Sequence, residues 1–141
     1  MNKLAGVHPR LVARVARVLA AMEAMGHPMI VTDGVRTEEE QAALYAQGRT
    51  TPGPNVRKGK PLGDTVTNAD GVRERSNHQL HADGCGHAVD CTFLGTDGKP
   101  RWDVNDPWAA YGACAKAQGL AWGGDWKARK DRPHVELVEG K

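Results

Sequence analysis

Apolar residues recur every three or four positions between residues 11 and 25, with Ala, Arg and Glu at most positions between them. This period is typical of an amphipathic α-helix that buries one face. Pro9 lies near the start of the segment and Gly26 just beyond its end, where helices favour these two residues. The pattern therefore predicts a helix that packs on a core. Its apolar positions are Leu11, Val12, Val15, Val18, Leu19, Met22 and Met25.

Two shorter elements are expected before a long polar stretch. Residues 29–32 form a short apolar run, which predicts a buried strand. Thr37 and Glu40 have the spacing of a capping box, which predicts a second helix that reaches about Gln47 and ends at Gly48. Residues 49–75 show little periodicity and many turn-forming residues, so we expect a long surface loop there. Loops of this length are usually functional or mobile.

Residues 87–93 have the two-residue alternation of a strand. This alternation places Val89, Cys91 and Phe93 on one face. It directs Asp90 to the other face, toward a cleft.

The last third of the chain predicts one helix and two strands. We expect the helix to extend from a cap at Asp106-Pro107 to Gln118, and residues 120–122 and 134–137 to form strands. The resulting order of elements predicts an α+β fold in which helices pack on a small antiparallel sheet. A chain of 141 residues can bury one core, so we expect a single domain over residues 1–141.

Charge and hydropathy exclude several classes of function. The net charge is only +2 and the basic residues are scattered, which is not the pattern of a nucleic-acid-binding protein. No apolar segment is long enough to span a bilayer, so no membrane insertion is expected. Arg10, Arg14 and Arg17 interrupt the N-terminal apolar residues, which predicts synthesis in the cytoplasm without a signal peptide. The three cysteines lack a CxxC pair, so neither a disulfide framework nor a cysteine zinc site is indicated. We expect a monomer.

His78, Asp90 and His134 could supply the three protein ligands of a catalytic zinc site, which leaves its fourth position for water. Twelve residues separate His78 from Asp90, so only the fold could bring them together. The alternative is that the six histidines are ordinary residues of polar loops.

Asp131 lies three residues before His134, and Pro133 stiffens the backbone between them. A carboxylate held beside a zinc-bound water can act first as general base and then as general acid. The alternative for Asp131 is a turn residue before a strand.

Five separated blocks of the sequence form a recognisable set. They are residues 33–50, Ser76-x-His78, Gly86-x-Ala88-Val89-Asp90, Trp122-Gly123-Gly124-Asp125-Trp126 and Asp131-x-Pro133-His134-x-Glu136-Leu137. Together they resemble one family of zinc peptidases, the VanY-like D-alanyl-D-alanine carboxypeptidases and L-alanyl-D-glutamate endopeptidases, particularly its phage endolysin branch. The resemblance extends from about Gly26 to Leu137 and implies a hedgehog/D-Ala-D-Ala-peptidase-like domain.

The resemblance implies a role for each matching polar residue. His78, Asp90 and His134 would bind Zn²⁺, and Asp131 would be the catalytic acid and base. Arg36 falls where the family has an arginine in the active-site cleft, so it would hold a substrate carboxylate or stabilise the oxyanion.

Four further residues in these blocks each have two readings. Ser76 could orient the substrate or a metal ligand, or be a turn residue. Gln41 could contact the substrate, or lie on the surface of the second helix. Trp122 and Trp126 could form walls of the groove or fill the core. Asp125 is expected to hold a turn at Gly123-Gly124.

The chain departs from the family pattern between the first two ligands. The family has its first histidine seven positions before the aspartate, whereas this chain has Asp83 there. Residues 80–84 resemble an insertion that keeps His78 as the ligand, and His81 is the alternative.

The resemblance implies a zinc-dependent peptidase that hydrolyses the peptidoglycan stem peptide at the cell wall or in the periplasm. Cleavage of the L-alanyl-D-glutamate bond by an endolysin is favoured. The alternatives are a D-alanyl-D-alanine carboxypeptidase and a non-catalytic wall-binding domain that keeps the zinc scaffold.

Overall fold

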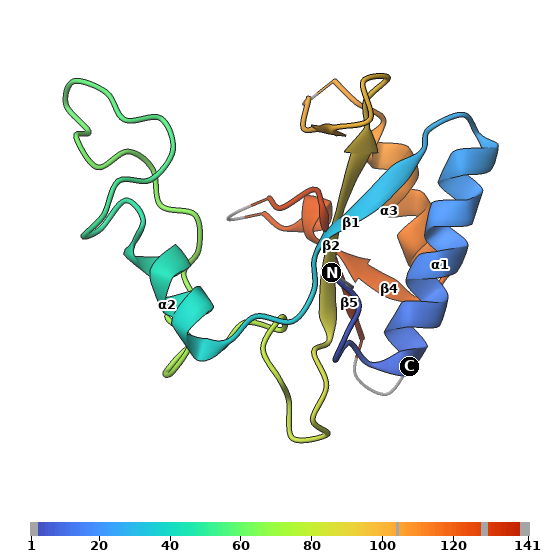
Figure 1. Ribbon diagram of the computed structural model, residues 1–141, viewed down its shortest axis with the longest axis horizontal. Coiled ribbons are helices and arrows are strands. Elements are labelled where there is room, and N and C mark those ends of the chain that lie inside the picture. The colour runs from blue at the N-terminus through green and yellow to red at the C-terminus, as the bar shows by residue number, and fades with distance from the viewer. Residues whose placement is uncertain (1–2, 104, 128–129, 139–141) are drawn as a thin grey trace.

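The computed structural model describes residues 3–103, 105–127 and 130–138. These residues form three α-helices, one short 3-10 helix and an antiparallel sheet (Figure 1). In chain order the elements are α1 (Pro9–Ala24), β1 (Met29–Asp33), α2 (Glu38–Ala46), β2 (Ala88–Leu94), β3 (Pro100–Arg101), α3 (Trp108–Ala117), β4 (Leu120–Trp122), the 3-10 helix η1 (Gly123–Asp125) and β5 (His134–Leu137).

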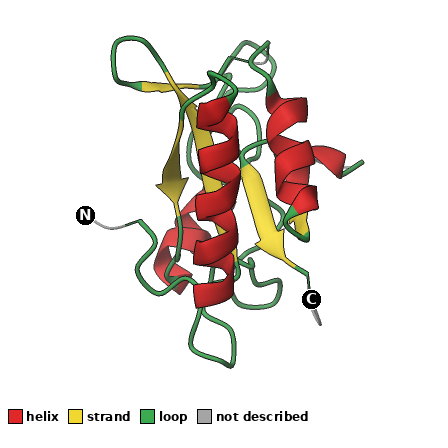
Figure 2. Ribbon diagram, turned by 90° about the vertical axis from the view of Figure 1, so that its right-hand side faces the viewer, coloured by secondary structure: helices red, strands yellow, loops and turns green. Residues whose placement is uncertain are grey.

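The sheet has the strand order β1-β2-β5-β4, and the short β3 pairs with the C-terminal end of β2. Every pairing is antiparallel. Helices α1 and α3 pack together on one face of the sheet (Figure 2). This arrangement confirms the predicted α+β fold. None of the described helices is long and apolar enough to cross a membrane.

The core lies between that face of the sheet and the two helices. Val89, Cys91 and Phe93 are each at most 1% exposed, as the alternation along β2 predicts. Burial of apolar side chains of this size contributes roughly 1.5–3 kcal/mol each. Since these residues occupy the core face, Asp90 is directed to the opposite face. The buried residues of α1 recur at helical spacing and are Leu11, Val15, Val18 and Met22.

Helix α2 begins with the predicted capping box. The Thr37 hydroxyl accepts a hydrogen bond from the Glu40 amide, and the Glu40 carboxylate accepts one from the Thr37 amide. After α2 the chain forms a long excursion with no helix or strand before β2, apart from isolated bridges, as predicted. The first part of this excursion extends away from the sheet (Figure 1).

Three details near α3 differ from the sequence prediction. The helix begins at Trp108 after Pro107, and no side chain of the described residues caps it. Asp106 instead pairs with Arg101 at 2.8 Å. The strand β3 was not predicted, because two exposed residues have no readable alternation. The side chain of Asp125, which was expected to hold a turn at Gly123-Gly124, is exposed at the end of η1 and pairs with Lys116 at 3.1 Å.

The indole ring of Trp122 lies between two glycines. A Cβ atom added to Gly112 of α3 would lie 2.3 Å from Trp122 Cε3, and one added to Gly124 would lie 2.2 Å from Cζ2. The Trp122 Nε1 donates to the Arg132 carbonyl at 2.7 Å, and the ring packs against the core. Trp122 is therefore a packing residue, which settles its two readings, and its position depends on the absence of side chains on both sides.

Substitution of Gly112 should show whether the Trp122 indole needs the space beside this residue. Alanine normally stabilises a helix interior by about 1 kcal/mol over glycine. We expect Gly112→Ala instead to destabilise the protein by about 1–3 kcal/mol, because the methyl group overpacks against the indole. Urea unfolding would measure this change. Ala113→Ser on the exposed side of the same helix is the control and should change stability by less than about 0.5 kcal/mol. An unchanged or more stable G112A protein would contradict the packing described for Trp122.

Candidate metal centre and active-site groove

The pairing of β2 with β5 places Asp90 and His134 directly opposite each other. Their neighbours Val89 and Val135 are also paired, and both are buried in the core. Because side chains alternate along a strand, the carboxylate and the imidazole emerge together on the other face of the sheet. Two residues 44 positions apart in the sequence thus become neighbours.

His78 reaches the same point from the end of the long excursion. Its backbone carbonyl accepts a hydrogen bond from the Arg36 amide at 2.9 Å, and its Nδ1 lies 2.8 Å from the Gly34 carbonyl oxygen. Gly34 must lack a side chain, because a Cβ atom there would lie 2.0 Å from the Lys3 carbonyl oxygen. His78 is 1% exposed, so these contacts hold its ring in one place.

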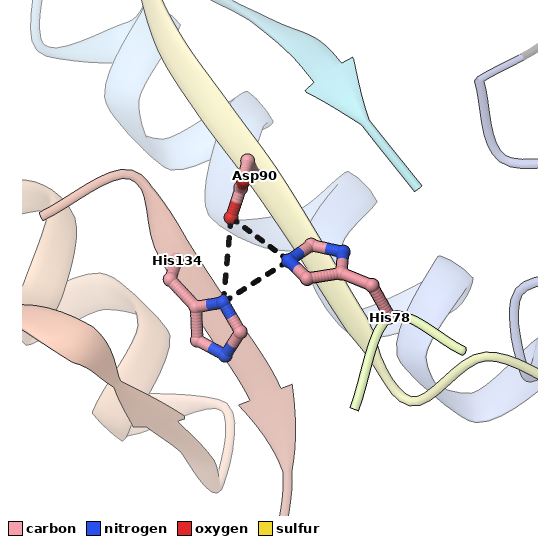
Figure 3. Close-up of side chains that lie close together, drawn as sticks. All are labelled: His78, Asp90 and His134. Carbon is pink, nitrogen blue, oxygen red and sulfur yellow. Dashed lines mark hydrogen bonds and ion pairs between the residues drawn. The ribbon is translucent and has the colours of Figure 1, made fainter. Parts of the chain in front are cut away.

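The three side chains form a nearly equilateral triangle of donor atoms (Figure 3). His78 Nε2 lies 3.2 Å from His134 Nδ1 and 3.3 Å from Asp90 Oδ1, and His134 Nδ1 lies 3.4 Å from Asp90 Oδ1. Among the described residues no other group of histidine, cysteine, aspartate or glutamate has the spacing of a metal site. Tetrahedral zinc with ligands at 2.0–2.1 Å separates them by about 3.3–3.4 Å. The triangle therefore has the dimensions of one face of a zinc tetrahedron.

The hydrogen bonds behind the two rings decide which nitrogens face the centre of the triangle with lone pairs. The Gly34 carbonyl can only accept, so His78 Nδ1 carries the proton. His134 Nε2 lies 2.6 Å from Glu136 Oε1 and donates to that carboxylate. In the neutral rings His78 Nε2 and His134 Nδ1 thus have free lone pairs, and both point at an anionic oxygen. The two lone pairs and the anionic oxygen repel one another unless a proton or a metal cation lies between them.

The charges of the site shift the pKa values of its residues. Burial alone would raise the pKa of Asp90, but its contacts with His134 and His78 hold that pKa far below the usual range. Burial lowers the pKa of His134, but the nearby Asp90 carboxylate and the hydrogen bond to Glu136 outweigh this effect and raise the pKa to about 9. The site therefore attracts a cation strongly.

Arg36 holds the second oxygen of Asp90. Its guanidinium lies 3.3 Å from Asp90 Oδ2, donates to Asp33 Oδ2 at 2.7 Å and donates to Gln41 Oε1 at 3.1 Å. With Oδ2 engaged in this way, Oδ1 of Asp90 is left facing the two imidazoles. Among the described residues, the buried Oδ1 has no hydrogen-bond partner, as expected for an atom that serves as a metal ligand.

A groove of about 980 Å³ opens over the triangle. Its size is that of a ligand-binding cleft. One wall belongs to the long excursion and the other to the segment after η1. The lining includes Thr67, Ser76, Trp126, Lys130 and Asp131.

Asp131 lies at the edge of the triangle, with Oδ2 3.8 Å from His134 Nδ1. Its backbone amide donates to the Gly123 carbonyl at 3.0 Å, and a Cβ atom on Gly123 would lie 2.2 Å from the Asp131 carbonyl oxygen. The first glycine after Trp122 is thus needed for the acid to approach the site. Burial and the negative charge of Asp90 raise the pKa of Asp131.

Comparisons with known proteins agree with this geometry. A family model described as D-alanyl-D-alanine carboxypeptidase matches residues 70–137. The peptidoglycan L-alanyl-D-glutamate endopeptidase CwlK of Bacillus subtilis (strain 168) is 31% identical over 140 residues, which cover 94% of this chain and 74% of CwlK. The chain therefore belongs to the VanY-like family of D-alanyl-D-alanine carboxypeptidases and L-alanyl-D-glutamate endopeptidases.

Solved structures share the fold. The L-Ala D-Glu endopeptidase ChiX of Serratia marcescens has a TM-score of 0.57 and 25% identity, with 96% of this chain and 84% of ChiX covered. The D,D-pentapeptidase VanY from a VanB-type resistance cassette, crystallised with Zn(II), has a TM-score of 0.63 and 18% identity, with 94% and 72% covered. Together with the donor triangle, family membership supports the predicted Zn²⁺ cofactor.

The two predicted substrate-binding residues, Ser76 and Gln41, have different positions relative to the groove. Ser76 lines the groove, and its Oγ accepts a hydrogen bond from the His78 amide at 3.2 Å. Gln41 is fully buried and does not line the groove, so neither a substrate contact nor a surface position fits it. Its amide instead donates to the Ala69 carbonyl at 2.9 Å and connects Arg36 to the long excursion.

The positions of the Trp126 and His81 rings decide between alternatives that the sequence left open. Trp126 lines the groove, and its ring centroid lies 4.8 Å from that of His134. His81, the alternative ligand, lies outside the donor triangle, and its ring stacks on His87 at a centroid distance of 3.7 Å.

Glu136 is a site residue to which the sequence reasoning gave no role. It follows His134 by two positions on β5, so both side chains lie on the same face. That spacing was the available signal. Burial raises the pKa of Glu136, but the hydrogen bond to His134 outweighs this effect and lowers it, so the carboxylate stays ionised.

The raised pKa of His134 predicts how zinc binding depends on pH. Below about pH 9 the ring is protonated, and zinc must displace that proton before it can bind Nδ1. We expect the zinc dissociation constant to fall by up to about tenfold per pH unit between pH 7 and 8.5, because one proton is displaced. Competition with a chelator of known protonation behaviour would measure this slope. A dissociation constant that does not vary with pH would show that no proton occupies the site.

Proposed function

We propose that this peptidase is zinc-dependent and hydrolyses the stem peptide of cell-wall peptidoglycan at the L-alanyl-D-glutamate bond. The observation that supports the proposal most strongly is the triangle of His78, Asp90 and His134 at the floor of a groove that also contains Asp131. A metal site with one open face and an adjacent acid is the arrangement that peptide hydrolysis needs. The similarity to CwlK and ChiX supports the choice of bond.

In this proposal the chain's own residues have separate tasks. Zinc bound by the three donors would supply a Lewis acid that polarises the scissile carbonyl and lowers the pKa of water. Asp131 accepts the proton of the attacking water and passes it to the leaving amine. Its raised pKa suits this exchange, because a carboxyl group that is too acidic returns a proton poorly.

Arg36 has a structural task and a chemical one. Its contacts with Asp33, Gln41 and Asp90 fix the guanidinium at the floor of the groove. From there it orients the Asp90 ligand, and it can also stabilise negative charge on the carbonyl oxygen of the substrate. Ser76 holds the backbone of His78, which favours the orientation of a ligand over contact with the substrate.

D-alanyl-D-alanine carboxypeptidase activity is the second candidate, because the family model that matches residues 70–137 has that description. A non-catalytic wall-binding role is disfavoured, because the proposed acid and all three proposed ligands are present together. The assignment to phage endolysins rests on the Trp-Gly-Gly-Asp-Trp and Asp-x-Pro-His blocks of the sequence.

Digestion of purified peptidoglycan should distinguish the two peptidase activities. We expect new amino-terminal D-glutamate when zinc is present and none after treatment with a chelator, as measured by mass spectrometry of the released ends. Released D-alanine without new D-glutamate ends would favour the carboxypeptidase. Protein that contains zinc but releases neither product would overturn both assignments.

Removal of the acid should separate chemistry from metal binding. We expect Asp131→Asn to lower kcat by about 10²–10⁴-fold, because no carboxylate then transfers the proton, while the bound zinc stays at one equivalent. The wild-type kcat/KM should fall on acidification through the raised pKa of Asp131, and D131N should lose this acidic limb. The matched control is Asp125→Asn, at an exposed carboxylate outside the groove. A D131N enzyme with wild-type kcat would remove Asp131 from the mechanism.

A further inference from the structure

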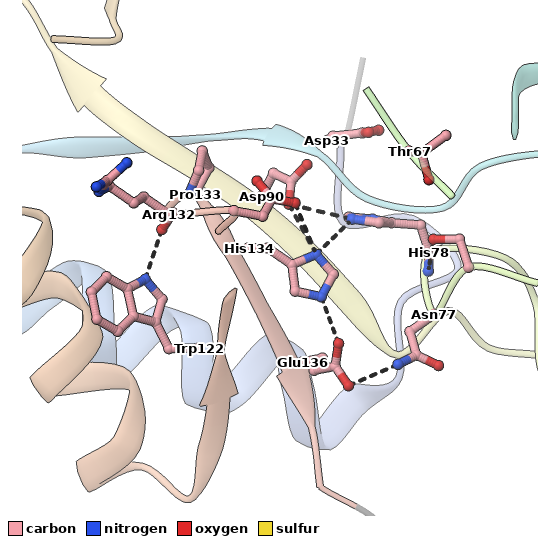
Figure 4. A network of polar contacts seen from close by, with 12 residues as sticks. Asp33, Thr67, Asn77, His78, Asp90, Trp122, Arg132, Pro133, His134 and Glu136 are labelled. Atoms are coloured by element: carbon pink, nitrogen blue, oxygen red, sulfur yellow. Dashed lines mark hydrogen bonds and ion pairs between the residues drawn. The ribbon is translucent and has the colours of Figure 1, made fainter. Parts of the chain in front are cut away.

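Asn77 is connected to the proposed metal centre through one intermediate residue, Glu136. Its side-chain Nδ2 donates to Glu136 Oε2 at 2.7 Å, while the other oxygen of Glu136 accepts from His134 Nε2 at 2.6 Å (Figure 4). Both oxygens of the carboxylate are thus assigned. The chain of contacts runs from Asn77 through Glu136 to His134, whose Nδ1 faces the triangle.

The backbone of Asn77 is also fixed. Its carbonyl accepts a hydrogen bond from the His87 amide at 2.8 Å, close to the start of β2. The next residue is the buried His78. The amide that reaches Glu136 is therefore presented by a rigid segment, and it comes from the loop side of the groove rather than from the sheet.

The Glu136 carboxylate needs this hydrogen bond from Asn77 because other orientations are open to it. Its side chain borders the groove over the triangle and also a second cavity of about 550 Å³, which is lined by His8, His81, Asp83 and His87 among others. A carboxylate open to both spaces can turn toward water or toward the centre of the triangle. Either movement would release His134 Nε2 and let the ring rotate.

We propose that Asn77 is a positioning residue that sets the zinc affinity of the site by holding Glu136 on His134. The inference rests on the proposed zinc site. Partners that orient a metal-bound histidine typically change metal affinity by 10–100-fold when they are altered. Asn77 acts one step further out, through the orientation of the carboxylate.

A space-filling role for Asn77 makes a different prediction, and aspartate distinguishes the two. Asn77→Asp keeps the shape of the side chain but removes the donor and places a second carboxylate beside Glu136 Oε2. Asn77→Ala removes the donor without adding charge. If Asn77 positions Glu136, N77D should weaken zinc binding more than N77A does; if it only fills space, N77D should resemble the wild type.

The test is a zinc titration of the full chain in competition with a chromophoric chelator, with circular dichroism to verify that each variant is folded. We expect the zinc dissociation constant to rise about 3–10-fold in N77A and about 10–100-fold in N77D. Asn105→Asp, at an exposed turn before α3, is the control and should leave the constant unchanged.

A double-mutant cycle with Glu136→Gln shows whether the effect passes through Glu136. In the E136Q background N77A should raise the zinc dissociation constant by less than about twofold, because the carboxylate that Asn77 holds is gone. An equal loss in both backgrounds, or an N77D protein with wild-type affinity, would overturn the inference alone. A folded wild-type protein that binds no zinc would overturn the proposed function and this inference together.

Discussion

The antiparallel register between β2 and β5 is the constraint on which the rest of the site depends. It places Asp90 opposite His134 and, on the other face, Val89 opposite Val135. A slip of one residue would exchange the two faces, and would bury the carboxylate in the core while it exposed the valines. The hydrophobic core therefore specifies the register. The register in turn brings two of the three donor atoms, those of Asp90 and His134, close together.

The third donor depends on loop geometry. His78 follows a long excursion without regular structure, and its position comes from backbone contacts with Gly34 and Arg36 just after β1. Those contacts require a glycine at position 34, where the chain passes against Lys3. The sheet thus provides a rigid floor, whereas the loop supplies a ligand and one wall of the groove.

The sequence predicted the parts of the fold that follow from periodicity. The alternation around Asp90 correctly separated the buried residues of β2 from the residue that faces the groove, and the capping box at Thr37 was read correctly. Local sequence could not predict that Arg36 and Gln41 form a buried connection behind Asp90, because that contact depends on where the long excursion returns. The insertion after His78 posed the same difficulty, since only the fold shows His81 stacked on His87 outside the triangle.

The central claim is that His78 Nε2, Asp90 Oδ1 and His134 Nδ1 bind one zinc ion. Anomalous diffraction from crystals grown with zinc, recorded on both sides of the zinc absorption edge, tests it most directly. The account predicts one strong anomalous peak at about 2.0–2.2 Å from each of the three atoms. A peak only beside His81, Asp83 and His87, or no peak in crystals with an intact donor triangle, would contradict it.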